Sequence, residues 1–197
     1  MKKLSSSFKN MLLSLTVICG VAAALLAFVN DSTKETIAAG NQKTLIEGIK
    51  KVSPKSDNNP FAEKVGVEIS GDIYNLYPAR KGGVLVGVAV ETLSHDGFSG
   101  DINILVGMDK ESNITGYTVL QQAETPGLGA EMDNWFRAEG TAHNVIGLSL
   151  VEPLRVTKDG GTVDAITAAT ISSRAFLGAL NNAQAAYKKA LDDKLIK

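Results

Sequence analysis

The stretch INILVGMDKESNITGYTVL, residues 102–120, contains two apolar runs separated by a short polar segment. INILVGM (102–108) and ITGYTVL (114–120) are rich in residues that favour strands, whereas DKESN between them is typical of a turn. This pattern predicts an antiparallel β-hairpin. Three upstream segments are also rich in Val, Ile and Tyr, so we expect further strands at 65–69, 73–79 and 83–93.

The C-terminal part of the chain changes to a helical period from Ser173 onward. Polar residues such as Asn181 and Lys188 lie off the apolar face. The chain is therefore expected to be an α+β protein, with antiparallel strands and packed helices in one domain at 61–197. The residues of the predicted apolar stripe are Phe176, Ala179, Leu180, Ala183, Tyr187 and Ala190.

An uncharged segment, MLLSLTVICGVAAALLAFV, occupies residues 11–29. A helix of this length just spans a hydrocarbon core of about 30 Å. Lys2, Lys3 and Lys9 precede it, so residues 1–10 are expected in the cytoplasm and the domain outside, with the helix as a single-pass inner-membrane anchor. The alternative is a cleaved signal peptide, whose apolar region is shorter and ends at small residues.

Residues 30–60 are expected to form a stalk helix followed by a loop. STKE (32–35) matches a capping box at the start of a helix that would run to about Lys51. SPKSDNNP (53–60) has the composition of a loop.

Composition excludes several functions. The net charge of −1 argues against a nucleic-acid partner. The single cysteine, Cys19, allows no internal disulfide and no iron–sulfur cluster held by this chain alone. His95 and His143 lie far apart in sequence, so a metal site of His and Cys is not expected.

DAITAATISSRAF (164–176) leads into the C-terminal helix with four hydroxyl side chains, those of Thr167, Thr170, Ser172 and Ser173. The first turn of a helix attracts a phosphate, and Ala168 and Ala169 would leave the backbone open to a bulky ligand. The alternative is that Ser172 and Ser173 cap the helix. The local pattern leaves both open.

ETPGLGAEMDNWF (124–136) directly follows the predicted hairpin. Gly127 and Gly129 after Pro126 would let a ligand approach the backbone closely. An ordinary Pro-Gly turn is the alternative, with Trp135 and Phe136 as core residues.

Together the two stretches resemble the FMN-binding domain family. DAITAAT (164–170) is similar to its flavinylation motif, Asp-x-x-Ser/Thr-Gly-Ala-Thr/Ser, and ETPGLG (124–129) is similar to its other characteristic block. Alanine stands at position 168, where the family usually has glycine, and alanine restricts a positive φ angle.

The resemblance implies that the Thr170 hydroxyl is esterified to the phosphate of FMN by a transferase that uses FAD and magnesium. Asp164 would be the acid that this enzyme reads. Thr167, Ser172 and Ser173 would donate hydrogen bonds to the phosphodiester, beside Ala168 and Ala169. The isoalloxazine ring would be bordered by Glu124, Thr125, Pro126, Gly127, Leu128 and Gly129.

The single anchor and the order of the motifs are similar to those of the G-subunit family of Rnf electron-transport complexes. The resemblance implies an electron relay in a membrane complex that couples ferredoxin and NAD to ion translocation, with catalysis left to other membrane and peripheral subunits. Covalent attachment would prevent loss of the flavin outside the cytoplasm. The alternatives are the C subunit of the sodium-translocating NADH:quinone reductase and a flavin-free, membrane-anchored assembly or binding module.

Overall fold

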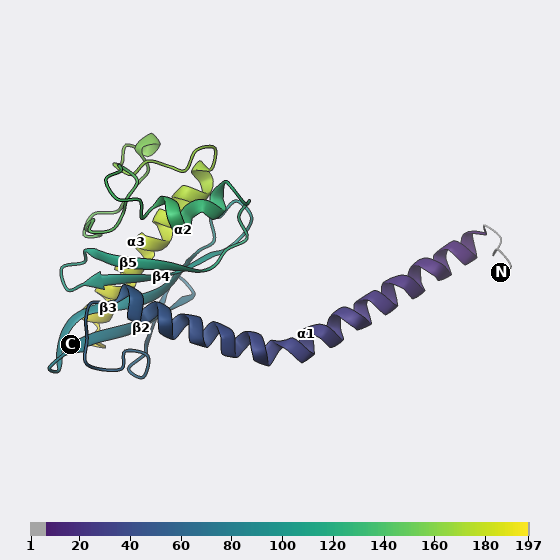
Figure 1. Ribbon diagram of the computed structural model, residues 1–197, viewed down its shortest axis with the longest axis horizontal. Helices are drawn as coiled ribbons and strands as arrows, with labels where there is room; N and C mark the ends of the chain where they lie inside the picture. The colour runs from purple at the N-terminus through teal and green to yellow at the C-terminus, as the bar shows by residue number, and fades with distance from the viewer. Residues whose placement is uncertain (1–6, 197) are drawn as a thin grey trace. The chain divides into compact units, whose positions relative to one another are not determined.

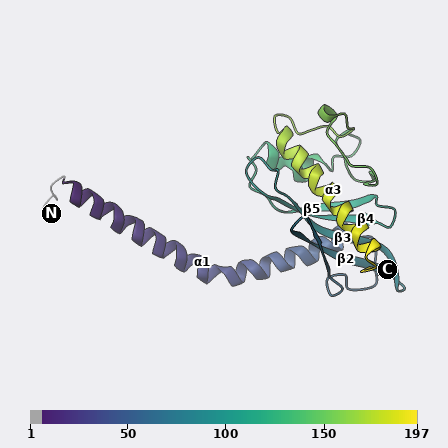
Figure 2. The ribbon, with the colours of Figure 1, turned by 180° about the vertical axis from the view of Figure 1, so that it is seen from behind.

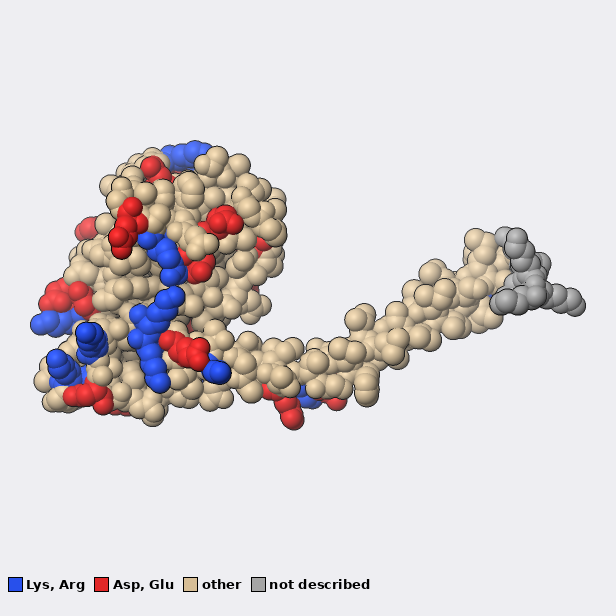
Figure 3. Space-filling model, in the orientation of Figure 1, with Lys and Arg blue, Asp and Glu red and all other residues tan. Residues whose placement is uncertain are grey.

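The computed structural model describes residues 7–196, so the predictions for Lys2 and Lys3 lie outside the described residues. The chain divides into two compact units, Met1–Lys43 and Thr44–Lys197. One helix, α1 (Phe8–Val52), belongs to both units (Figure 1). Its apolar part is long enough to cross a membrane, and Figure 3 shows it without acidic or basic side chains.

The predicted capping box at Ser32 is wrong, because α1 runs through this position without interruption. The Ser32 hydroxyl donates to the carbonyl of Phe28 at 2.8 Å, and Thr33 donates to that of Val29 at 2.8 Å. The four residues before Ser32 already provide helical carbonyls, so its own backbone N–H is not at a helix end. The anchor and the predicted stalk helix are therefore one element.

The second unit is built on a five-stranded antiparallel sheet in the order β1-β2-β3-β4-β5. The predicted hairpin is confirmed as β4 and β5, in which Val106 pairs with Tyr117. The three upstream strands are confirmed too: the first has the predicted bounds, the second extends beyond them at both ends, and the third is shifted by one residue. The strands are β1 (Val65–Ile69), β2 (Asp72–Lys81), β3 (Val84–Ser94), β4 (Ile102–Asp109) and β5 (Ile114–Gln121).

Helix α3 (Thr170–Asp192) covers one face of this sheet (Figure 2). All residues of the predicted apolar stripe are buried. Phe176 stacks on Phe136 with ring centroids 4.4 Å apart and meets the Tyr117 ring edge-on at 4.9 Å. The Thr92 hydroxyl of β3 donates to the carbonyl of Ala179 at 3.0 Å, which fixes the helix along the sheet.

The last turns of α1 cover the other face of the sheet. Ile49 and Val52 are buried there against Tyr77, Ala89 and Leu105. The Thr115 hydroxyl of β5 donates to the carbonyl of Val52 at 2.5 Å. A side chain at Gly107 would collide with the backbone of Val52, so glycine permits this close approach.

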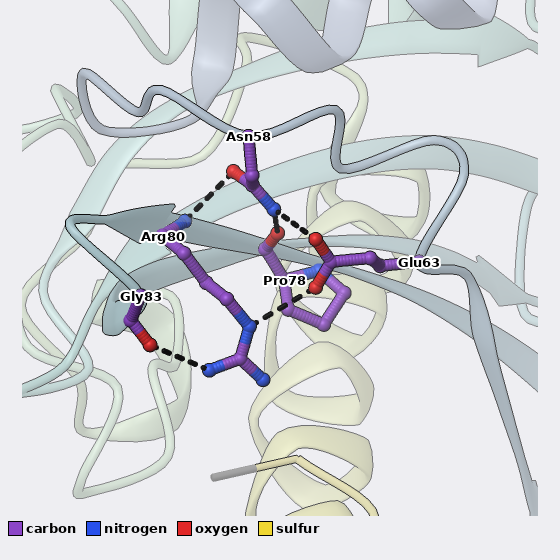
Figure 4. Close-up of polar contacts among 5 residues, drawn as sticks. All are labelled: Asn58, Glu63, Pro78, Arg80 and Gly83. Atoms are coloured by element: carbon purple, nitrogen blue, oxygen red, sulfur yellow. Dashed lines mark hydrogen bonds and ion pairs between the residues drawn. The ribbon is translucent and has the colours of Figure 1, made fainter.

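The loop after α1 is tied to β2 by Asn58 (Figure 4). Its side chain accepts a hydrogen bond from the Arg80 N–H at 2.9 Å and donates to the Pro78 carbonyl and to Glu63, both at 2.9 Å. Arg80 in turn donates to Glu63 at 3.0 Å. The hydrogen bond from Asn58, followed by that from Arg80, lowers the pKa of Glu63.

The segment between β5 and α3 carries three short helices, η1 (Gly129–Glu131), α2 (Met132–Trp135) and η2 (Thr157–Asp159). The Trp135 indole N–H donates to the carbonyl of Asp164 at 3.1 Å, and the same ring stacks on His143. The hydrogen bond holds Trp135 beside the segment that leads into α3.

Candidate functional site

A pocket of about 300 Å³ lies where three segments meet: the loop before β4, the ETPGLG loop, and the first turn of α3. This volume is at the lower end of the range for ligand pockets, and a flexible ligand could extend from it into solvent. Its wall is formed by Phe98, Glu124, Thr125, Leu128, Gly129, Ala168, Ala169, Thr170, Ile171 and Ser172.

Thr170 is the first residue of α3 and lies on the pocket wall. Its hydroxyl oxygen accepts a hydrogen bond from the Lys158 ammonium at 3.0 Å. The residue before it, Ala169, has no side-chain group that could cap the helix, so the first N–H groups of α3 keep their attraction for an anion. A lysine, a helix N-terminus and a hydroxyl thus converge on one point.

Lys158 is held in place by η2. Asp159, its neighbour, makes a two-pronged ion pair with Arg174, with both hydrogen bonds at 2.7 Å. The hydrogen bond from Arg174 lowers the pKa of Asp159, so this carboxylate stays charged near neutral pH. The ion pair connects η2 to the second turn of α3 and so keeps Lys158 beside Thr170.

Ala168 adopts a left-handed conformation with φ of 60°. It lies in a tight turn in which the Ala169 N–H donates to the carbonyl of Ile166 at 3.0 Å. Ser173 supports the turn: its hydroxyl accepts from the Ile166 N–H and donates to the Ala169 carbonyl, both at 2.9 Å. Alanine therefore adopts a left-handed conformation at position 168, where the motif resemblance leads us to expect glycine.

Ser172 and Ser173 do not cap α3 with their side chains, because both hydroxyls bond elsewhere. The Ser172 hydroxyl donates to the Glu124 carboxylate at 2.6 Å. That carboxylate also accepts from the Ser99 N–H at 3.1 Å. Glu124 therefore joins all three segments of the pocket.

Most of the predicted site residues come together in the pocket wall, and five described ones lie outside it. Sequence reasoning missed three residues of the site. Phe98 and Ile171 are exposed apolar side chains on the wall, and Lys158 donates a hydrogen bond to Thr170. An isolated aromatic residue in a loop and a lysine 12 residues before Thr170 carry no local signal. The five predicted residues outside the wall are Pro126, Gly127, Asp164, Thr167 and Ser173.

The chemistry of this site suits a flavin nucleotide. Phe98, Leu128 and Ile171 offer exposed apolar surface for a planar ring, while Lys158 and the N-terminus of α3 offer positive charge for a phosphate. Among residues 7–196, no cluster of three or more His, Cys, Asp or Glu side chains could hold a metal ion.

Comparison with known proteins agrees with this chemistry. Residues 97–185, which include the pocket, match the FMN-binding domain family. The chain is 37% identical over 194 residues to the G subunit of the ion-translocating oxidoreductase complex of Yersinia pestis, covering 93% of this chain and 91% of that protein. The corresponding protein of Aliivibrio fischeri is 32% identical over 194 residues, with the same coverage of both chains.

A third relative is the G subunit of the Na(+)-translocating ferredoxin:NAD(+) oxidoreductase complex of Acetobacterium woodii, 32% identical over 190 residues and covering 89% of each chain. The fold and the pocket thus define an FMN-binding protein with an apolar N-terminal helix. The chain belongs to the G-subunit family of ion-translocating Rnf oxidoreductase complexes.

Proposed function

We propose that this chain is the flavoprotein subunit of an ion-translocating ferredoxin:NAD oxidoreductase complex, in which it relays electrons through FMN bound covalently to Thr170. The family and the FMN-binding domain support the relay and the other subunits as partners. The observation that carries the covalent link is the position of Thr170, on the pocket wall at the N-terminus of α3 and next to Lys158.

The residues of the site have separate tasks in this proposal. Lys158 and the first N–H groups of α3 neutralise a phosphodiester at Thr170. Phe98, Leu128 and Ile171 would pack against the ring and shield it from water. FMN supplies the ability to accept and pass on electrons one or two at a time, which no side chain of this pocket provides.

Attachment requires a transferase that uses FAD and magnesium as its partner. A bond forms between the Thr170 hydroxyl oxygen and the FMN phosphorus, and the pyrophosphate bond of FAD breaks. AMP leaves, and the hydroxyl proton passes to a base of the transferase or to water. Thr167 and Ala168 are exposed and lie outside the fold's core, so an enzyme can reach this turn.

The experiment is peptide mass spectrometry of full-length protein made together with the transferase. We expect an FMN adduct on Thr170 in the tryptic peptide that spans residues 159–174. Thr170→Ala should abolish the adduct, while Thr167→Ala, which removes an exposed hydroxyl three residues away, should keep it on Thr170 at reduced yield, because a predicted hydrogen bond to the phosphodiester is lost. Thr170→Ser should retain part of it.

An adduct that maps to Thr167 would contradict the assignment of Thr170. Wild-type protein with neither covalent nor tightly bound flavin would instead favour the assembly or binding module. The membrane orientation belongs to the same proposal: Lys9 and the residues before it would lie in the cytoplasm and the FMN-binding domain outside, which makes a covalent tether useful because lost cofactor could not be replaced there.

A further inference from the structure

Glu124 is the only acidic or basic side chain among residues 7–196 that the structure buries, with 5% of its surface exposed. A carboxylate is costly to bury unless hydrogen bonds compensate for lost water. Here one oxygen accepts from the Ser99 N–H and the other from the Ser172 hydroxyl. Both partners donate, so the surroundings suit the acceptor-only carboxylate.

Two glycines pack closely against this carboxylate. A Cβ at Gly97 would lie 2.9 Å from one carboxylate oxygen of Glu124, and a Cβ at Gly129 would lie 2.7 Å from the other. Both distances are too short for any side chain at these positions. Gly97 also packs against the Gly100 carbonyl and Gly129 against the Ser172 hydroxyl, so this one buried charge lies in a closely packed shell.

Glu124 also lies on the wall of the pocket that contains Thr170. We propose that the charge of Glu124 lowers the midpoint potential of the flavin held in this pocket. This inference rests on the proposed function, and it gives Glu124 a role beyond packing the ETPGLG loop. Glu124 acts on the flavin through its electric field and is a positioning and tuning residue, not a catalytic one.

The direction of the effect follows from charge balance. A flavin reduced by two electrons and one proton carries one more negative charge than before. A fixed negative charge nearby opposes this change, and it does so strongly where protein rather than water fills the space between. Exposed carboxylates act weakly, because solvent and salt screen them within about 10 Å at 0.1 M ionic strength.

The test is a redox titration of purified full-length protein carrying covalent FMN, at about pH 8 and 0.1 M salt. Dithionite supplies the electrons, and water supplies the protons. Glu124→Gln keeps the shape of the side chain but removes its charge, so we expect a higher midpoint potential than in the wild type. Glu131→Gln removes an exposed carboxylate from η1, directly after the ETPGLG loop, and should leave the potential unchanged.

Ser172→Ala distinguishes an effect of the Glu124 charge from an effect of altered packing. It removes the hydroxyl that donates to Glu124 but keeps the carboxylate, whose charge is then less compensated. We expect its midpoint potential to fall, opposite to that of Glu124→Gln. If the potential rises in both variants, or if neither moves it, the charge of Glu124 does not set the potential.

If Glu124→Gln does not fold or take up flavin, Ser172→Ala decides alone: a fall supports the inference, and an unchanged or higher potential overturns it. Wild-type protein without flavin would overturn the proposed function and this inference together. If the wild-type protein carries flavin but the midpoint potentials of Glu124→Gln and Ser172→Ala shift in the same direction, only the role of Glu124 is overturned.

Discussion

Ala168 holds a left-handed backbone conformation in the turn that leads into α3. For an L-residue other than glycine this region costs about 1–2 kcal/mol, because its Cβ crowds the following carbonyl. The surrounding hydrogen bonds from Ser173 and the Ala169 N–H keep the turn in place despite this cost. The strain is local to the attachment turn.

We expect Ala168→Gly to stabilise the protein. Glycine removes the steric cost, and the extra freedom that it gives to the unfolded chain offsets about 0.5–1 kcal/mol, so the net gain should be about 0.5–1 kcal/mol. Chemical denaturation of the full chain in detergent measures it. Ala169→Gly is the matched control: Ala169 has φ of −130°, so glycine there should only destabilise. Destabilisation of similar size in both variants would contradict this account.

At the residue scale, sequence reasoning located the hydroxyl cluster but not the partners of each hydroxyl. Ser172 and Ser173 look equivalent in the sequence, yet one bonds to Glu124 and the other to the turn at Ile166. Only the packing of α3 against the ETPGLG loop distinguishes them. Lys158 was missed for the same reason, since its position depends on an ion pair between Asp159 and Arg174.

At the scale of elements, His95 stabilises the loop before β4. Its ring lies between Asp101 at 2.9 Å and Asp72 at 3.2 Å. Only the protonated ring donates to both carboxylates at once. The hydrogen bond to Asp101, and then that to Asp72, raise the pKa of His95 above its ordinary value of 6.5. This loop also supplies Phe98 and Ser99 to the pocket.

The contribution of His95 to stability should therefore depend on pH. Because the pKa is raised in the folded state, the contribution is complete below about pH 6.5 and is lost as the pH rises through the folded-state pKa. We expect His95→Gln to destabilise the protein more at about pH 6 than at about pH 9. Urea unfolding of both proteins across this range measures the difference. A constant difference would show that the two ion pairs do not contribute.

The elements themselves were largely predictable, because the strand-forming runs and the helical spacing of apolar residues are both clear in the sequence. Residues at 102–120 showed the hairpin and its turn, and the stripe beginning at Phe176 showed the buried face of α3. The absence of a helix start at Ser32 was not predictable, because a capping box is a local signal and α1 was already helical there. Tertiary contacts, or a helix that already extends through the motif, override such local signals.

At the scale of the whole molecule, the proposed topology places the C-terminus outside the cytoplasm. We expect a phosphatase reporter that matures only in an oxidising compartment to be active when fused after Lys197. The positive-inside tendency at Lys2, Lys3 and Lys9 is the physical reason. A fluorescent reporter that matures only in the cytoplasm serves as the control fusion. Strong fluorescence from that fusion would contradict the orientation.

The order of the strands separates two kinds of contact in the domain, those near in sequence and those far apart. Every pairing in the sheet joins consecutive strands, so the sheet forms from contacts that are near in sequence. The contact between Thr92 and Ala179, by contrast, joins residues 87 positions apart. α3 follows all five strands in the sequence, and it brings Thr170 and Ser172 to the pocket beside the sheet. The pocket therefore depends on contacts between distant parts of the chain, and a variant truncated before α3 would keep the sequence of all five strands but lose Thr170, the proposed acceptor of the flavin.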